Sequence, residues 1–254
     1  MDRPNRRSCR TLAALLLACL CGLVLTPTTA HAAGELDGRY RVTTTGIEIG
    51  RAALSMRRGD EGLAVGFSFE NGSLLGLVEP SLTQMRSILE EHRRESRPLR
   101  YDALFRKEDR DREVSLAYAA EGAIRSYRLV KRGRVRLDQV PADLPENTLD
   151  PMAALAHVRA WLDRATEGDA LTLVLFDGRK RYDATLRFMG SVQTTYDGMN
   201  VAAHHVAARY RMVAELDEDE GVLDPVSDSR ERQLDALMSA DGRYLPLRLS
   251  GSFD

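Results

Sequence analysis

The sequence is poor in cysteine. It contains three, Cys9, Cys19 and Cys21, and all of them lie in its first 21 residues. Disulfides and thiolate chemistry are therefore excluded from the remainder of the chain. Residues 33–254 are nevertheless enough to bury a hydrophobic core without disulfides, and their number suits one large β domain or two small ones.

Motifs for common cofactors are also missing. The sequence has no Gly-x-Gly-x-x-Gly run and no phosphate-binding loop, so a nucleotide cofactor has no evident site. It has no His-x-x-x-His pair and no His-Glu-x-x-His motif, which disfavours zinc. His204 and His205 are adjacent on a predicted strand and should point to opposite faces, where they cannot easily share one metal. The other histidines after residue 33 are His92 and His157, the latter on a predicted helix.

Long hydrophobic runs are absent except for Leu12 to Leu25. This run follows four arginines and is followed by Ala30-His31-Ala32, an order typical of a secretory signal peptide. The run is about 14 residues long, which is shorter than the roughly 20 needed to span a bilayer. We therefore expect residues 1–32 to be a cleaved signal peptide and the protein to be exported to the periplasm, with no membrane span in residues 33–254.

A second way of processing the N-terminal segment stays open. Cys19 follows Leu16-Leu17-Ala18, which resembles a bacterial lipoprotein signal, and its lipidation is the alternative. Leu17 fits that pattern poorly, and apolar residues continue through Leu25. Cleavage after Ala32 is the preferred interpretation.

Lysine is rare, with three residues against 33 arginines. The arginines are scattered along every segment between aspartates and glutamates, which indicates a solvated surface rather than a device for recognising anions. Removal of residues 1–32 takes away four Arg and one Asp, leaving 32 basic and 37 acidic side chains and a net charge of about −5. This balance argues against nucleic acid as a partner.

Alternation of large and polar residues is the dominant local pattern, and it predicts strands. Residues 82–95 are ambiguous because Leu82, Met85 and Leu89 have helical spacing, but a strand is preferred. Pro246 indicates an edge position or a local bulge in the last strand. The predicted strands cover 39–45, 47–56, 63–69, 98–106, 113–118, 124–130, 135–137, 171–176, 181–188 and 244–249, with hairpin or turn signals at Asn71-Gly72, Asp177-Gly178, Asp197-Gly198 and Asp241-Gly242.

One helix is predicted over residues 151–164. Asp150 is a good N-cap residue, and Pro151 follows it at the first helical position. One apolar face is formed by Met152, Leu155, Ala156, Val158, Trp161 and Leu162.

The order of these elements resembles the exported bacterial family DUF3108, a family of unknown function. The similarity is carried by Tyr40-x-Val42 with Gly46-Ile47-x-Ile49-Gly50-x-Ala52, by Asp150-Pro151-Met152-Ala153-Ala154-Leu155, and by Asp241-Gly242-Arg243-Tyr244-Leu245-Pro246-Leu247-Arg248. The resemblance implies a periplasmic, mostly antiparallel β protein with one helix on its sheet, and it carries no catalytic residues. The acidic region 215–231 departs from the family pattern, looks like an insertion, and is expected to be a solvated loop.

The predicted fold is therefore mainly β, with a single domain over residues 33–254. We expect a single curved antiparallel sheet, or a partly open barrel, with one main helix packed on it.

Three further kinds of chemical site are possible in principle. The stretch from Asp217 to Asp228 could chelate Ca²⁺, but Gly221 falls at the fifth position and Asp228 stands where an EF-hand has a glutamate, so a solvated charge run is favoured. Ser73 lies in Gly72-Ser73-Leu74-Leu75-Gly76, whose spacing is wrong for a nucleophile elbow. A glycosidase-like pair among the many carboxylates has no support in the sequence. No catalytic, cofactor-binding or metal-binding residue is assigned.

The sequence therefore favours a non-enzymatic, envelope-associated binding module of the periplasm. One alternative is a carrier of a lipid or hydrophobic small molecule with a half-barrel groove. Another is an envelope-assembly protein that docks a protein partner along an exposed edge such as the Pro246 strand. A hydrolase of envelope polymers is the third possibility, and it would need perturbed carboxylates or histidines in one cleft.

Overall fold

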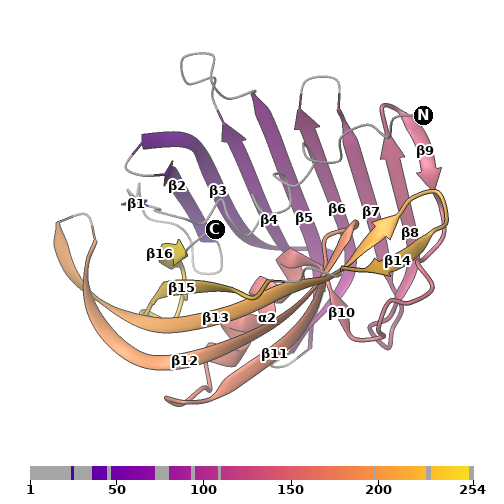
Figure 1. The fold of residues 1–254 in the computed structure, drawn as a ribbon. Coiled ribbons are helices and arrows are strands. Elements are labelled where there is room, and N and C mark those ends of the chain that lie inside the picture. Colours follow the sequence, from indigo (N-terminus) through magenta and orange to yellow (C-terminus); the bar gives the residue numbers. More distant parts are fainter. Residues whose placement is uncertain are drawn as a thin grey trace.

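The strands form two sheets, and the helix lies between them (Figure 1). This computed structural model describes residues 24–25, 36–44, 47–71, 80–92, 95–107, 110–196, 198–226 and 230–251. Several predicted turn residues, Gly46, Gly72 and Asp197, lie outside these ranges, as do Ser73 and Asp228. No helix in the described part of the chain is long and apolar enough to cross a membrane.

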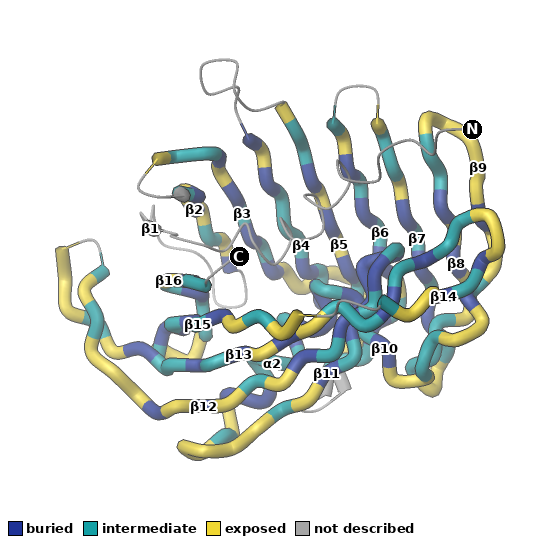
Figure 2. The backbone as a smooth tube through the Cα atoms, in the orientation of Figure 1, coloured by how far each residue is buried: buried dark blue, intermediate teal, exposed yellow. Residues whose placement is uncertain are grey.

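The first sheet is an antiparallel meander of nine strands, in which the spatial order equals the chain order. Buried and more exposed positions alternate along most of its strands, as Figure 2 shows, because successive side chains of a strand point to opposite faces. The strands are β1 (Val24–Leu25), β2 (Leu36–Thr44), β3 (Ile47–Gly59), β4 (Gly62–Asn71), β5 (Ser81–His92), β6 (Glu95–Lys107), β7 (Arg112–Tyr118), β8 (Ile124–Lys131) and β9 (Arg134–Leu137).

The second sheet has the order β10-β11-β12-β13-β15-β16, and β14 also pairs with β13. All its pairs are antiparallel except β10 with β11. Its strands are β10 (Thr148–Leu149), β11 (Ala170–Phe176), β12 (Lys180–Tyr196), β13 (Met199–Asp217), β14 (Val222–Pro225), β15 (Arg232–Ser239) and β16 (Pro246–Gly251). The mainly β class with one helix is confirmed, and the strands divide between two sheets that do not close into a barrel.

Helix α2 (Pro151–Leu162) joins the two sheets. It contacts β4, β5 and β6 of the first sheet and β11 of the second. Ala153 and Ala156 belong to the buried cluster of the first sheet, whereas Trp161 and Leu162 belong to that of the second. The helix therefore supplies side chains to both halves of the core.

Most strand predictions are confirmed, including the strand over the ambiguous residues from Leu82 on, which is β5. Pro246 begins β16, the last strand of the second sheet, and the register shifts beside its partner Met238. Both expected features of this proline, an edge position and an irregularity, are therefore present.

The prediction of a solvated loop over residues 215–231 is wrong in part. Strand β13 continues to Asp217, and β14 returns beside it after a tight turn. Leu216 and Leu223 pair across this hairpin and are both buried against the first sheet. The acidic composition of the segment predicted a loop, but it contains this apolar pair. Burial of the two leucines holds the segment as a hairpin.

Asp150 fixes the start of the helix to the first sheet. Its carboxylate is fully buried, and Oδ1 accepts hydrogen bonds from the backbone N–H groups of Met152 and Ala153, both at 2.9 Å. Oδ1 also accepts from Ser87 Oγ of β5 at 2.7 Å, and Oδ2 accepts from Tyr118 Oη of β7 at 3.1 Å. Burial raises the pKa of Asp150, and these four hydrogen bonds oppose that rise.

The substitution Asp150→Ala should lower the free energy of unfolding by at least about 3 kcal/mol, because it removes the helix cap and leaves buried donors without an acceptor. Asp150→Asn retains one acceptor oxygen and should cost clearly less. Urea unfolding followed by circular dichroism measures both, with Asp143→Ala in an exposed loop as the control. Equal losses for the alanine and asparagine variants would contradict the assigned role of the accepting oxygen.

Candidate functional site

A cavity of about 220 Å³ lies between the inner faces of the two sheets and beside helix α2. Apolar side chains form nearly all of its wall, and Asp177 is the one charged residue that lines it. The first sheet contributes Tyr40, Ala52, Leu54, Phe67 and Met85; the helix contributes Pro151, Met152, Ala154, Leu155 and Val158; the second sheet and its turns contribute Leu173, Leu175, Asp177, Tyr182, Ala184, Leu186, Val206, Ala208, Tyr210, Leu234, Ala236, Met238, Pro246 and Leu249.

Small side chains create this space. Ala154 stands on the helix, while Ala184, Ala208 and Ala236 stand on the neighbouring strands β12, β13 and β15. A protein interior is normally filled by setting a large side chain opposite a small one, and here alanines on the helix and on the second sheet line the same space. Within the second sheet, each alanine has a larger residue as its cross-strand partner: Ala184 faces Tyr210, Ala208 faces Leu234, and Ala236 faces Val206.

Several side chains that line the cavity remain partly exposed to solvent. Phe67 lines the cavity and remains half-buried, although Val65 and Phe69 on the same face of β4 are 0% and 1% exposed. Leu155 and Val158 of the helix also line the cavity and are half-buried. The two inner faces therefore do not close on each other at this point.

The cavity wall carries few polar groups. Tyr40 is 5% exposed, and its hydroxyl is buried without a hydrogen-bond partner in the described structure. Burial raises the pKa of Tyr40, and the neighbouring Tyr196 adds to the rise, so the phenol is neutral. Burial likewise raises the pKa of Tyr182. The surface that faces the cavity is therefore almost wholly apolar.

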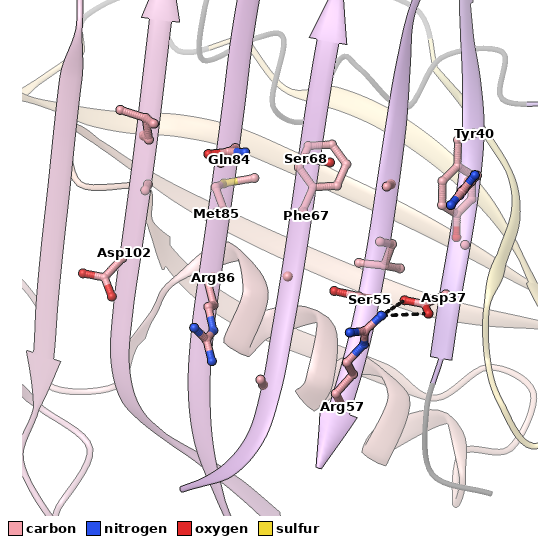
Figure 3. Close-up of a pocket in the computed structure, with 18 of the residues that line it drawn as sticks. Asp37, Tyr40, Ser55, Arg57, Phe67, Ser68, Gln84, Met85, Arg86 and Asp102 are labelled. Carbon is pink, nitrogen blue, oxygen red and sulfur yellow. Dashed lines mark hydrogen bonds and ion pairs between the residues drawn. The ribbon is translucent and has the colours of Figure 1, made fainter. Parts of the chain in front are cut away.

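A larger depression of about 1150 Å³ adjoins this cavity and shares Tyr40, Leu54, Phe67, Met85 and Pro246 with it. Figure 3 shows strands of the first sheet in front of the helix, with Gln84, Arg86 and Asp102 on the near side. The depression thus lies on the face of the first sheet away from helix α2, and the strands stand between it and the cavity.

Three charged groups that line the depression, Asp37, Arg57 and Asp102, form ion pairs at the surface. Arg57 pairs with Asp37 at 3.1 Å, and Asp102 pairs with Arg100 at 2.7 Å. None of the charged side chains lining it is buried. Such exposed ion pairs contribute little energy and little selectivity, so the apolar cavity is the better candidate for a binding site.

Comparison with known proteins places the chain in a family. The family model described as "Protein of unknown function (DUF3108)" matches residues 39–254. The chain belongs to the DUF3108 family. The resemblance seen in the sequence is thereby confirmed, and it assigns no activity and no site residue. No curated protein and no solved structure matches this DUF3108 chain.

The histidines of the DUF3108 chain do not form a common site. His204 packs against Phe188 and Tyr244, with ring centroids 5.2 Å and 5.7 Å away, whereas His205 Nε2 lies 2.9 Å from Asp235 Oδ1. His204 pairs across the sheet with the buried Met238, and His205 pairs with the half-buried Leu237, so they occupy opposite faces as predicted. His157 lies on the helix and donates from Nδ1 to the carbonyl of Ala153. For His92 the structure describes only the backbone.

The acidic stretch is explained by its turn. Asp217 Oδ1 accepts hydrogen bonds from the N–H groups of Asp219 and Glu220, at 2.8 Å and 3.1 Å. Within the described ranges no group of three or more His, Cys, Asp or Glu side chains could hold a metal ion. The predicted turn residue Asp177, by contrast, acquires a place in the cavity wall that its turn motif did not indicate.

The adjacent helix residues Ala153 and Ala154 should respond oppositely to enlargement. Ala153 is fully buried in the first cluster, whereas Ala154 lines the cavity. Ala153→Leu should therefore lower the unfolding free energy by about 1–3 kcal/mol through overpacking, while Ala154→Leu should be neutral or stabilising. Urea unfolding of the two variants measures the difference, and equal destabilisation would show that the cavity is filled in solution.

Proposed function

We propose that this protein is an exported, non-enzymatic carrier that holds one apolar small molecule in the cavity between its sheets. The observation that carries the proposal is the apolar space beside α2, lined from two sheets and a helix. Filling it with protein atoms would need only larger residues at Ala154, Ala184, Ala208 or Ala236. A dry apolar cavity of comparable size binds small hydrocarbons readily.

The cavity volume limits the size of the cargo. A water molecule occupies about 30 Å³ in the liquid and a methylene group is of similar size, so 220 Å³ holds about seven methylenes. This suits a single medium-length alkyl chain or a small ring system. It does not suit the two acyl chains of a phospholipid without expansion.

The expected affinity follows from the number of methylene groups that the cavity holds. Each buried methylene contributes about 0.8 kcal/mol, so about seven contribute roughly 5–6 kcal/mol, which corresponds to a dissociation constant on the order of 0.1 mM.

Export is supported by the sequence of residues 1–32, whose basic, apolar and Ala-His-Ala segments suit a signal peptide. When the full chain is expressed in a bacterial host, the periplasmic fraction should contain a protein beginning at Ala33. N-terminal sequencing with intact mass measurement checks this. A product beginning at a lipidated Cys19 would instead support membrane anchoring, and retention of Met1 in the cytoplasm would overturn export.

Binding can be tested with the methionine methyl groups. Met85, Met152 and Met238 line the cavity, whereas Met56 is buried elsewhere and Met199 is 58% exposed. Titration of ¹³C-methyl-methionine protein with 1-octanol should shift the three cavity signals together and leave Met56 and Met199 unchanged. Ala154→Leu should abolish or greatly weaken this response, because leucine occupies the space.

Absence of any shift up to the solubility of 1-octanol would contradict the proposal, as would shifts at Met199 alone. Native mass spectrometry of the freshly purified protein, followed by organic extraction, then asks which natural molecule is bound.

The alternative of a protein partner docked along β16 has weaker support. This edge strand has six residues, and Pro246 lacks the N–H that a ladder would use. A protein that copurifies stoichiometrically in the same mass measurement would favour this alternative.

A further inference from the structure

Charged side chains are almost absent from the hairpin formed by β12 and β13. They make up 29% of the sequence, yet residues 188–208 contain a single one, Asp197. This stretch covers the second half of β12 and the first half of β13. Arg187 and Arg209 stand immediately outside it, one on each strand. The chain therefore places a nearly uncharged hairpin between two cations.

The end of this hairpin projects beyond the rest of the second sheet. Strand β11 pairs with β12 only as far as Arg187, and β15 pairs with β13 only from Ala203 on. Figure 1 shows β12 and β13 continuing past the ends of these neighbours. We call residues 192–196 and 199–202 the arm. Within the described ranges, each strand of the arm has only the other as its strand partner.

The two faces of the arm differ in polarity. Cross-strand partners lie on the same face of a sheet, and the register pairs Tyr196 with Met199 and Thr194 with Val201. Val192 lies on this face as well, because it is two residues from Thr194. One face of the arm is therefore mainly apolar. The opposite face is polar but uncharged, with Gln193, Thr195 and Asn200.

Part of the apolar face is exposed to solvent. Five large apolar side chains are clearly exposed in the described part of the chain, and Met189, Val192 and Met199 of this hairpin are three of them. Met199 is the most exposed of the five, at 58%. Tyr196, by contrast, packs partly against the buried cluster of the first sheet, which holds the end of the arm in place. Exposed apolar side chains gathered in this way mark a contact surface.

We propose that the arm docks the protein on the surface of an anionic lipid bilayer, with Met199 and Val192 in the interfacial region of the membrane. Both faces of the arm lack charged side chains, which are the groups most costly to bring into a membrane. Tyrosine is enriched at the level of the lipid head groups. Arg187 is exposed and forms no ion pair in the described structure, so it is free to meet anionic head groups.

The contact should be shallow. A two-stranded arm carries unpaired backbone N–H and C=O groups along its outer edges, and such groups cannot enter the hydrocarbon without a partner. Side chains of the apolar face therefore reach the interface while the backbone stays at the level of the head groups. This inference goes beyond the proposed function, because it concerns where the protein meets a membrane and does not depend on what the cavity holds.

Vesicle flotation of the protein purified from the periplasm tests the proposal. The wild-type protein should float with vesicles of seven parts phosphatidylcholine to three parts phosphatidylglycerol at about 0.1 M salt, and less at about 1 M, where charges are screened. Met199→Glu should lower the partition coefficient about tenfold or more, because an apolar side chain no longer enters the interface. Val135→Glu, at a 47% exposed valine of β9, adds the same charge away from the arm and should bind like the wild type.

The role of Arg187 has a matched control of its own. Arg187→Gln should lower the partition coefficient about fivefold, as expected for one basic residue near an anionic surface. Arg134→Gln removes an equally exposed type of charge from β9 and should have little effect. Urea unfolding of all four variants checks that the differences do not arise from lost stability.

A fluorescent label reports contact directly. Residues 33–254 contain no cysteine, so Met199→Cys provides a single thiol for an environment-sensitive nitrobenzoxadiazole dye. Its emission should rise and shift to shorter wavelength when the anionic vesicles are added. The same dye on Val135→Cys should not respond.

Three results would overturn the proposal. The first is failure of the wild-type protein to float with the anionic vesicles, and the second is equal flotation of the wild type and Met199→Glu, as a lipid attached to Cys19 would cause. The third is a wild-type dimer in gel filtration that Met199→Glu converts to a monomer, which would assign the arm to a second copy of the chain. None of them alters the 1-octanol titration of the cavity, so the carrier function is judged separately.

Discussion

The structure depends on one buried carboxylate. Asp150 is the N-cap of the only helix in the described chain, and its oxygens also accept hydrogen bonds from β5 and β7 of the first sheet. A carboxylate without a cation is costly to bury, and four donors compensate that cost here. Because the same atoms serve the helix and the sheet, the first turn of the helix is held against β5 and β7.

The position of the helix in turn determines the cavity. Its start is tied to the first sheet, and its buried residues divide between the two clusters. Ala154 of the helix and the alanines of β12, β13 and β15 line the space that remains between the helix and the sheets. A further contact between the sheets is the turn from Asp177 to Lys180, which Tyr127 and Val114 hold against β7 and β8. The β13–β14 hairpin, whose leucines are buried against the first sheet, adds another contact. A space is left between these contacts and the helix.

A carrier and a well-packed structural module differ in whether they keep an empty space in the core. A module that only holds partners together gains stability from every filled void, since each missing methylene costs packing energy. Retaining an apolar void is unfavourable for the empty protein and favourable for one that binds a ligand there.

The sequence by itself determined the local elements. Period-two alternation predicted the strands, Asp150-Pro151 predicted the helix start, and Asp-Gly pairs predicted the turns. These local structures depend on residues that are neighbours in the chain. It did not reveal the β13–β14 hairpin, where two leucines lie within an acidic segment. Only the tertiary structure divided the strands into two sheets, brought distant alanines together and buried Asp177. Whether an alanine fills a core or lines a void depends on what faces it across the fold, and sequence spacing carries no such information.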